Sequence, residues 1–223
     1  MIRALVIKEL KETWLLMAAA ALAYGWLLCG LTGWGPAAVE TPTSNMFFIW
    51  INRWGIPFVD GGFDNTFIVI TGLLAITFGL LQSVRESRQA TYLFLLHRPW
   101  PRWAFFLTKL AVGATIILVI SSLPILIYAR WAATPGNVPA PFEWSMTGPA
   151  WEIWLMMPLI YLGAFLSGLR PARWHATRLL PLAASIEAVN LRVNWGMSMA
   201  WLAPIYLLFI GAICIMARER DYS

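Results

Sequence analysis

The chain has 223 residues, of which 60% are hydrophobic and only 12% are charged, and its mean hydropathy is +0.67. Soluble domains carry about a quarter charged residues, so this composition excludes a disordered chain, a nucleic-acid-binding domain and an ordinary cytosolic enzyme. It predicts an all-α integral membrane protein. The net charge of the chain is +5. The two cysteines, Cys29 and Cys214, lie in apolar runs, so we expect packing residues and no disulfide.

Residues 1–12 have the pattern of an amphipathic helix at the inner surface of the membrane. Ile2, Val6 and Leu10 form an apolar stripe. The other face carries the charged residues Arg3, Lys8, Glu9, Lys11 and Glu12. Lys8 and Glu12 also have the spacing of a helical ion pair. A solvated extension of the first span explains the same residues equally well, and the sequence leaves both interpretations open.

Apolar windows predict six membrane-spanning helices. In chain order they cover residues 13–31, 66–84, 107–129, 151–169, 177–192 and 195–217. The fifth window is ambiguous because it measures about 24 Å at 1.5 Å per residue, against about 30 Å of hydrocarbon. Arg178 and Arg192, near its opposite ends, could make up the difference by snorkelling.

The distribution of basic residues decides between five and six spans. With six spans and both termini in the cytoplasm, every Lys and Arg except Arg53, Arg130 and Arg192 lies on the inner side. With five spans, the basic C-terminal stretch 217–220 would lie outside. The sequence therefore predicts six helices, with cytoplasmic N- and C-termini, in a single transmembrane domain over residues 1–223.

The longest outer loop, 32–65, contains an apolar piece (44–54) that we expect to pack against the helices.

The inner segment between the second and third spans, residues 85–106, is longer than a simple connector. It starts with polar residues, continues with an apolar helical patch from Tyr92 to Leu96, and restarts with basic residues after a proline break. This pattern predicts a short helix across the inner face, with exposed residues that could meet a soluble partner. The basic residues could instead bind anionic lipid head groups, which would need no such partner.

This segment resembles the one that follows the second helix in ABC-2-type transporter permeases. The positions that match the family pattern are Glu86, Thr91, Leu95, Leu96, Pro99, Arg102, Lys109 and Leu110. The stretch 8–12 resembles the family's amphipathic elbow helix, and 217–221 resembles its usual ending. Many members carry a sizeable insertion between the last two spans, whereas this chain has only a few residues around 191–195. In that respect it resembles the compact permeases, including the haem-exporter B subunits.

The resemblance implies a permease subunit of an ATP-driven exporter in the inner membrane of a bacterium, working as a homodimer or heterodimer of permease protomers. A separate ABC ATPase subunit would supply ATP and Mg²⁺, because the chain has no Gly-x-x-x-x-Gly-Lys-Ser/Thr motif and is not expected to be an enzyme or to hold a cofactor. The coupling helix would meet that ATPase through Glu86, Thr91, Leu96, Arg98, Pro99 and Arg102. Taken singly, Glu86 and Arg102 are equally well explained as solvated loop charges. The cargo would be hydrophobic or amphiphilic, and the only other partner would be membrane lipid, with no nucleic acid.

Two other functions stay open at this point. An accessory or structural subunit of a larger complex could reuse the permease fold. A membrane enzyme acting on lipid is disfavoured, because the sequence shows no paired acid–base residues.

A few polar residues inside or beside the spans are further candidate sites. Glu187, with Asn190 one turn later, is a candidate intramembrane polar site, and the alternative is an ion pair with Arg192 at the outer interface. His97 and His175 lie far apart in the sequence without a carboxylate or thiolate cluster, so no metal site is expected.

Overall fold

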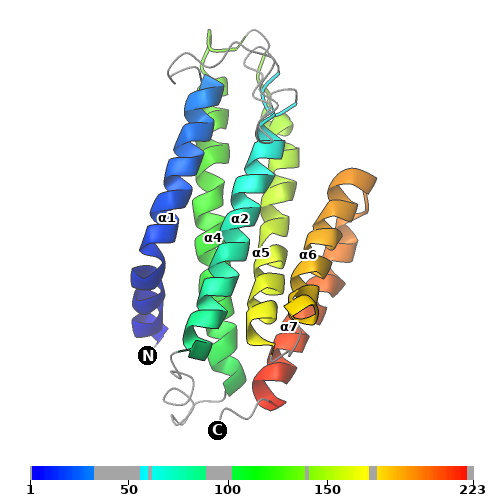
Figure 1. Ribbon diagram of the computed structural model, residues 1–223. Helices are drawn as coiled ribbons and strands as arrows, with labels where there is room; N and C mark the ends of the chain where they lie inside the picture. Colours follow the sequence, from blue (N-terminus) through cyan, green and yellow to red (C-terminus); the bar gives the residue numbers. More distant parts are fainter. Residues whose placement is uncertain are drawn as a thin grey trace. The chain divides into compact units, whose positions relative to one another are not determined.

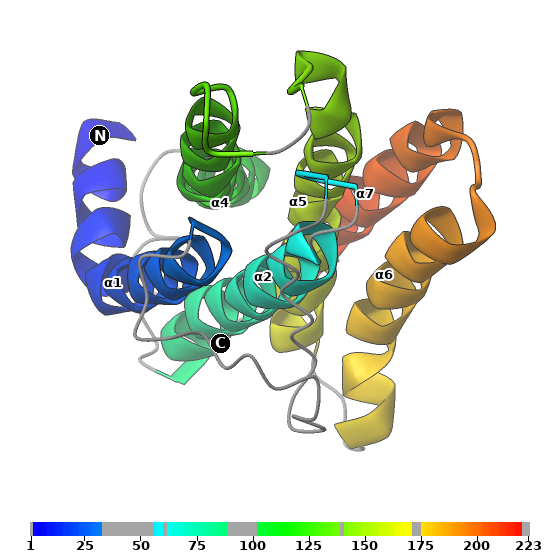
Figure 2. The same ribbon diagram turned by 90° about the horizontal axis from the view of Figure 1, so that it is seen from above.

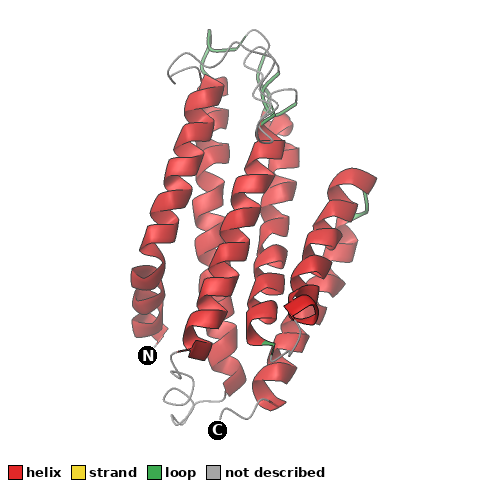
Figure 3. Cartoon of the chain, viewed as in Figure 1, coloured by secondary structure: helices red, strands yellow, loops and turns green. Residues whose placement is uncertain are grey.

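The computed structural model describes residues 2–32, 56–59, 62–88, 102–138, 141–170 and 175–219. Most of them belong to long helices (Figure 1): α1 (Ile2–Thr32), α2 (Phe63–Arg88), α4 (Arg102–Ala132), α5 (Gly148–Leu169), α6 (His175–Trp195) and α7 (Leu202–Glu219). Two 3-10 turns, η1 (Trp144–Thr147) and η2 (Met199–Trp201), precede α5 and α7. Over these ranges all regular secondary structure is helical, as Figure 3 shows, which confirms the all-α prediction.

Five of the described helices are long and apolar enough to cross a membrane: α1, α2, α4, α5 and α7. The chain is therefore compatible with a multi-pass membrane protein. The exception is α6, which contains Arg178, Glu187 and Arg192. It has 21 residues, or roughly 31 Å at 1.5 Å per residue. Its length therefore suffices for a span, but its composition does not confirm the predicted sixth one.

The helix bounds agree with the predicted spans to within about five residues, except at the starts of the first and last spans; α1 begins at Ile2, whereas the first span was predicted from residue 13. The window 195–217 was predicted, but α6 continues to Trp195 and α7 begins only at Leu202. Gly196 ends α6 with a φ of 65°, and its N–H donates to the carbonyl of Arg192 at 3.1 Å. A glycine in this left-handed conformation commonly terminates a helix. The predicted apolar piece 44–54 lies outside the described residues.

The N-terminal residues continue α1 without a break, so a separate elbow helix is not confirmed and the backbone matches the alternative, an extension of the first span. The predicted charged, solvated face is wrong at Glu9. Glu9 is only 1% exposed, whereas Leu10 is 40% exposed. Glu9 is buried because it has a cationic partner inside the protein, Lys109. The predicted pair of Lys8 and Glu12 is confirmed, at 3.9 Å and partly exposed.

The described contacts divide the chain into two compact units. The first unit comprises Met1–Trp14, Gly72–Ile117 and Met156–Ser223, and the second comprises Leu15–Thr71 and Leu118–Leu155. Four helices (α1, α2, α4 and α5) contribute residues to both units, whereas α6 and α7 belong to the first unit alone. The division of α1 falls after Trp14, near the point where the elbow was expected to give way to the span.

The buried centre of the first unit is α5, in which every residue from Met156 to Leu169 is buried. One close neighbour is α2, at Gly79. A Cβ on Gly79 would lie 2.7 Å from the carbonyl oxygen of Tyr161 and 2.9 Å from the backbone nitrogen of Phe165. Small residues let membrane helices approach backbone to backbone in this way. The contact requires glycine on α2 because the atoms opposite belong to the backbone and cannot rotate away.

Two further helices of the first unit pack on α5. Arg178 of α6 donates to the carbonyls of Ser167 and Gly168, at 3.2 and 3.1 Å. A cation is favourable there because the last carbonyls of a helix lack partners within it. Arg178 therefore joins the end of α5 to α6. After α6 the chain turns and returns as α7 (Figure 2). Tyr206 of α7 makes a hydrogen bond with the backbone of Leu159 in α5.

The second unit is held together by aromatic rings. Phe67, Phe63, Tyr128 and Trp131 stack in that order, with centroids 5.3, 5.4 and 5.7 Å apart. Phe58, in the turn before α2, lies 4.9 Å from both Phe63 and Tyr128. The φ of Phe58 is 63°, which is unfavourable for a residue with a side chain, and the burial of its ring among the others offsets that strain.

Candidate functional site

The predicted coupling segment is described only at its two ends. Glu86 lies in the last turn of α2 and Arg102 is the first residue of α4, and nothing of their side chains is described. The other predicted coupling residues, Thr91, Leu96, Arg98 and Pro99, lie outside the described residues. Their contacts with an ATPase stay a prediction. The structure does describe how the helices on both sides of this segment are fixed, and that region contains the best candidate site.

A buried ion pair joins α1 to α4 within the first unit. The ammonium of Lys109 lies 3.3 Å from Oε1 of Glu9, and each side chain is only 1% exposed. Removing two charges from water is costly, and a buried pair of this kind persists only when further hydrogen bonds satisfy its remaining atoms. The pair therefore depends on the polar groups around it.

Gln82 supplies one such hydrogen bond, and Tyr161 extends the pair into a network through Gln82. Nε2 of Gln82 donates to Oε2 of Glu9 at 2.8 Å. Oε1 of the same amide accepts from the hydroxyl of Tyr161 at 2.5 Å. Because both partners of Gln82 are fixed, its amide has one satisfactory orientation. The buried polar network is Glu9, Gln82, Lys109 and Tyr161, with one residue from each of α1, α2, α4 and α5.

Small and hydroxyl-bearing residues close the space around the network. Thr13 is buried and donates its hydroxyl to the backbone carbonyl of Glu9 at 2.7 Å, so it adds no competing donor to the carboxylate. Gly113 of α4 faces the network from the other side. A Cβ there would contact the hydroxyl of Tyr161 and would lie 3.1 Å from Oε1 of Gln82. Any side chain at position 113 would therefore disturb the bond between Tyr161 and Gln82.

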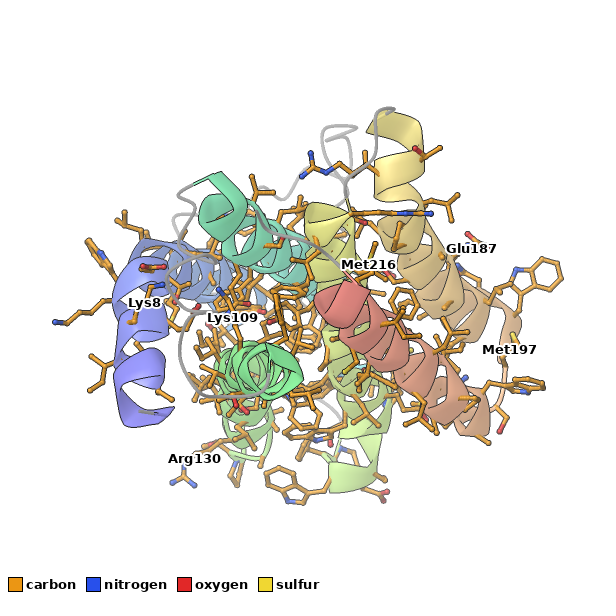
Figure 4. All side chains as sticks on the ribbon, turned by 90° about the horizontal axis from the view of Figure 1, so that it is seen from below. Lys8, Lys109, Arg130, Glu187, Met197 and Met216 are labelled. Atoms are coloured by element: carbon orange, nitrogen blue, oxygen red, sulfur yellow. The ribbon has the colours of Figure 1, made fainter. Side chains whose placement is uncertain are left out.

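The network lies near the helix ends that lead into the coupling segment. At 1.5 Å per residue, Gln82 and Lys109 are each within about 11 Å of the end of α2 and the start of α4 respectively. In Figure 4, Lys109 is enclosed by side chains between the helices. The arrangement can transmit force, because it fastens both helices that flank the segment to α1 and α5.

The second candidate, on α6, has a different arrangement. Glu187 and Asn190 are both exposed, and the amide of Asn190 lies 3.5 Å from Oε2 of Glu187. The chain of amides continues, because Asn194 donates to Oδ1 of Asn190. The structure therefore brings the two predicted residues together and adds Asn194. Figure 4 shows Glu187 on the outer face of α6. The alternative ion pair with Arg192 stays a prediction.

The remaining sequence predictions concern the histidines and the cysteines. His97 lies outside the described residues, and the side chain of His175 is not described. Within the described part of the chain there is no cluster of three or more metal-binding side chains. Cys29 is exposed, so it is not the buried packing residue that was expected, whereas Cys214 is half-buried.

The sequence predicted only part of the buried network. Lys109 belongs to the family pattern, whereas the amphipathic pattern places Glu9 on a charged, solvated face. The helical periodicity indicates a different position for Glu9. At 100° per residue, Glu9 falls about 60° from Val6 and about 40° from Thr13 around the helix axis, on the side that these two residues share. The sequence did not predict Gln82 and Tyr161, because the position of an amide or a phenol inside an apolar span does not indicate which residue it hydrogen-bonds.

Comparisons with protein-family models, curated proteins and solved structures find no match to this chain.

Proposed function

We propose that this chain is the permease subunit of an ATP-driven transporter of the ABC-2 type, in the inner membrane of a bacterium. It would move a hydrophobic or amphiphilic substrate, with ATP and Mg²⁺ bound by a separate ATPase subunit. A second permease protomer, the same chain or a related one, would complete the transporter. The described apolar helices support a multi-pass membrane protein, and the resemblance over residues 85–110 supports the transporter class.

The observation that carries the proposal is the buried polar network beside the coupling segment. A connector that merely joined two spans would not need the helices at both of its ends, α2 and α4, to be fastened to one carboxylate of α1. Here Lys109 of α4 and Gln82 of α2 both bind the carboxylate of Glu9. A displacement of the segment would therefore be shared by both flanking helices and by α1.

In this mechanism the ATPase pair closes on ATP and pushes the coupling helix. Because the network resists separation of the helices, the first unit would move as a block, and the permease would switch between inward-open and outward-open states. Glu86 and Arg102 would make polar contacts with the ATPase. The buried network would then transmit the movement and take no part in binding nucleotide.

The experiment is a purification of the tagged chain from its native membrane in a mild detergent. We expect a polypeptide with a Walker motif to co-purify, and the double variant Glu86→Ala and Arg102→Ala to lose most of that association. The matched control is Lys8→Met with Glu12→Leu, which removes a partly exposed pair on α1 and should leave the association intact.

Two outcomes would count against the proposal. If no ATPase associates with the intact protein, the accessory or structural subunit becomes the better explanation. If an ATPase associates equally well with the Glu86 and Arg102 variant, residues 85–106 are not the docking segment.

A further inference from the structure

Pro181 interrupts the backbone hydrogen bonds of α6. It is buried, and it lies inside the helix. Proline has no N–H to donate to the carbonyl four residues earlier, which belongs to Thr177, and its ring crowds that carbonyl. A proline inside a helix is therefore a frequent cause of a sharp kink. At this position the helix depends on partners outside itself.

Residues at the end of α5 bind the backbone of α6 on both sides of Pro181. Arg170, just after α5, donates to the carbonyl of Thr177 at 3.2 Å. Beyond the proline, the N–H of Leu182 donates to Oγ of Ser167 at 3.0 Å. In an uninterrupted helix both backbone groups would bond within the helix itself. The turn around Pro181 is therefore held by α5.

The part of α6 before the proline has further bonds to α5. Arg178 donates to the carbonyls of Ser167 and Gly168, at 3.2 and 3.1 Å. Arg170 bridges the same two helices in the opposite direction. Residues 177–182 are thus tied to the end of α5 by four hydrogen bonds. We call them the anchored arm of α6.

A close backbone contact lies directly after the anchored arm. A Cβ on Gly163 of α5 would lie 2.9 Å from the carbonyl oxygen of Pro181 and would overlap Oγ of Ser185. Because glycine has no Cβ, the two helices touch there. Burial decreases beyond this contact. Of residues 186–195, all of which the structure describes, Val189 is the one that is buried. We call this stretch the distal arm.

From these contacts we infer that α6 carries a hinge at Pro181: the anchored arm stays on α5 while the distal arm swings about the contact between Gly163 and Ser185. The bend costs few hydrogen bonds, because α5 already holds the backbone groups at the joint. Val193 lies twelve residues after Pro181. That separation is about 18 Å, so a bend of about 20° moves Val193 by about 6 Å.

The hinge separates α5 from α6 at one end of the pair and leaves the other end closed. In a transporter, such a joint would contribute to the change between two open states. The inference goes beyond the proposed function, because the movement needs neither an ATPase nor the coupling segment. Failure of the co-purification experiment would leave it untouched, and a rigid α6 would leave the proposed role of the buried polar network open.

Double electron–electron resonance between two spin labels tests the hinge in the full chain in lipid nanodiscs. In a background with Cys29→Ala and Cys214→Ala, one label is attached to Leu81→Cys on α2, the helix that touches the backbone of α5. The second is attached to Leu180→Cys in the anchored arm or Val193→Cys in the distal arm. The three positions are similarly exposed, at 48%, 57% and 45%. An excess of unlabelled chain restricts the measurement to distances within one chain.

We expect a narrow distance distribution between Leu81→Cys and Leu180→Cys. The distribution between Leu81→Cys and Val193→Cys should be wider by about 6 Å, the displacement for a bend of about 20°. Pro181→Ala restores the missing N–H and should narrow this second distribution to the width of the first. The matched control is Pro204→Ala, because Pro204 lies in the first turn of α7, where N–H groups lack intrahelical partners. It should leave the width unchanged.

The anchored arm has a test of its own. Arg170→Ala with Arg178→Ala removes three of the four hydrogen bonds that tie it to α5. We expect the distribution between Leu81→Cys and Leu180→Cys to widen in this variant. An unchanged narrow distribution would mean that these bonds do not hold the arm.

Three further results would overturn the inference. Equal widths for the two label pairs in the chain with its proline would mean that α6 is rigid, and this comparison requires no proline variant to fold. A wide distribution that persists in folded Pro181→Ala protein would place the bend elsewhere. Equal narrowing by Pro204→Ala would mean that the movement does not originate at Pro181.

Discussion

At the scale of single residues, the contrast between two ion pairs on α1 is the most informative. Glu9 and Lys109 are both 1% exposed, whereas Lys8 and Glu12 are about one-third exposed. Removing one partner of a buried pair leaves an uncompensated charge and typically costs about 3–5 kcal/mol. Exposed pairs contribute at most about 1 kcal/mol, because water solvates either partner when it is left alone.

We therefore predict that Glu9→Ala lowers the unfolding free energy by about 3–5 kcal/mol. Glu12→Ala, one turn away on the same helix, should lower it by less than about 1 kcal/mol. Reversible unfolding in mixed micelles, followed by circular dichroism, measures both. Equal effects of the two substitutions would mean that the pair of Glu9 and Lys109 is solvated in the membrane protein.

At the scale of helices, Gly79 fixes how closely α2 can approach α5. A Cβ at Gly79 would lie 2.7 Å from a backbone oxygen, whereas a Cβ at Gly72, about two turns away on the same helix, would have only the Cδ1 of Ile160 at 3.9 Å. The first contact requires the two helices to separate. The second is an ordinary van der Waals contact.

We predict that Gly79→Ala destabilises the protein by about 1–3 kcal/mol, because overpacking displaces a backbone. Gly72→Ala should be neutral or stabilising by up to about 1 kcal/mol, because alanine is the better helix former. Thermal denaturation of the two variants in the same detergent compares them directly. A Gly79→Ala protein as stable as the parent would show that α2 does not touch the backbone of α5.

The same two elements show how far the sequence predicts this fold. Apolar runs locate helices because burial in a membrane requires length and apolarity, so the bounds of α2 and α5 follow closely. The crossing at Gly79 does not follow, since the sequence contains 16 glycines and nothing local distinguishes the one that faces Tyr161. Glu9 was misassigned for a related reason: a charge on an amphipathic helix is expected to face water unless its buried partner is known.

At the scale of the whole molecule, an even number of spans places both termini on the same side of the membrane, and an odd number places them on opposite sides. Among the described helices, five meet the composition of a span, and α6 has sufficient length but contains Arg178, Glu187 and Arg192. Arg178 is held by carbonyls at the end of α5, so its charge is partly compensated by protein. This contact lowers the cost of placing Arg178 in a membrane, and the crossing by α6 stays a prediction.

We predict that both termini lie in the cytoplasm. Green fluorescent protein fused to either terminus should fluoresce in bacteria, and alkaline phosphatase fused to either should be inactive, because the first folds only in the cytoplasm and the second only in the periplasm. An active phosphatase at the C-terminus with a fluorescent N-terminus would show an odd number of spans.

The central claim is that the buried polar network transmits movement from an ATPase to the helices. A direct test replaces the pair by apolar residues, Glu9→Leu with Lys109→Met, since such replacements often preserve stability. We predict that this variant, reconstituted with its ATPase in nanodiscs, remains assembled but loses substrate-stimulated ATP hydrolysis by at least about fivefold, the lower range of typical coupling free energies. Lys8→Met with Glu12→Leu should keep the stimulation. Full stimulation in the assembled Glu9 and Lys109 variant would contradict the claim.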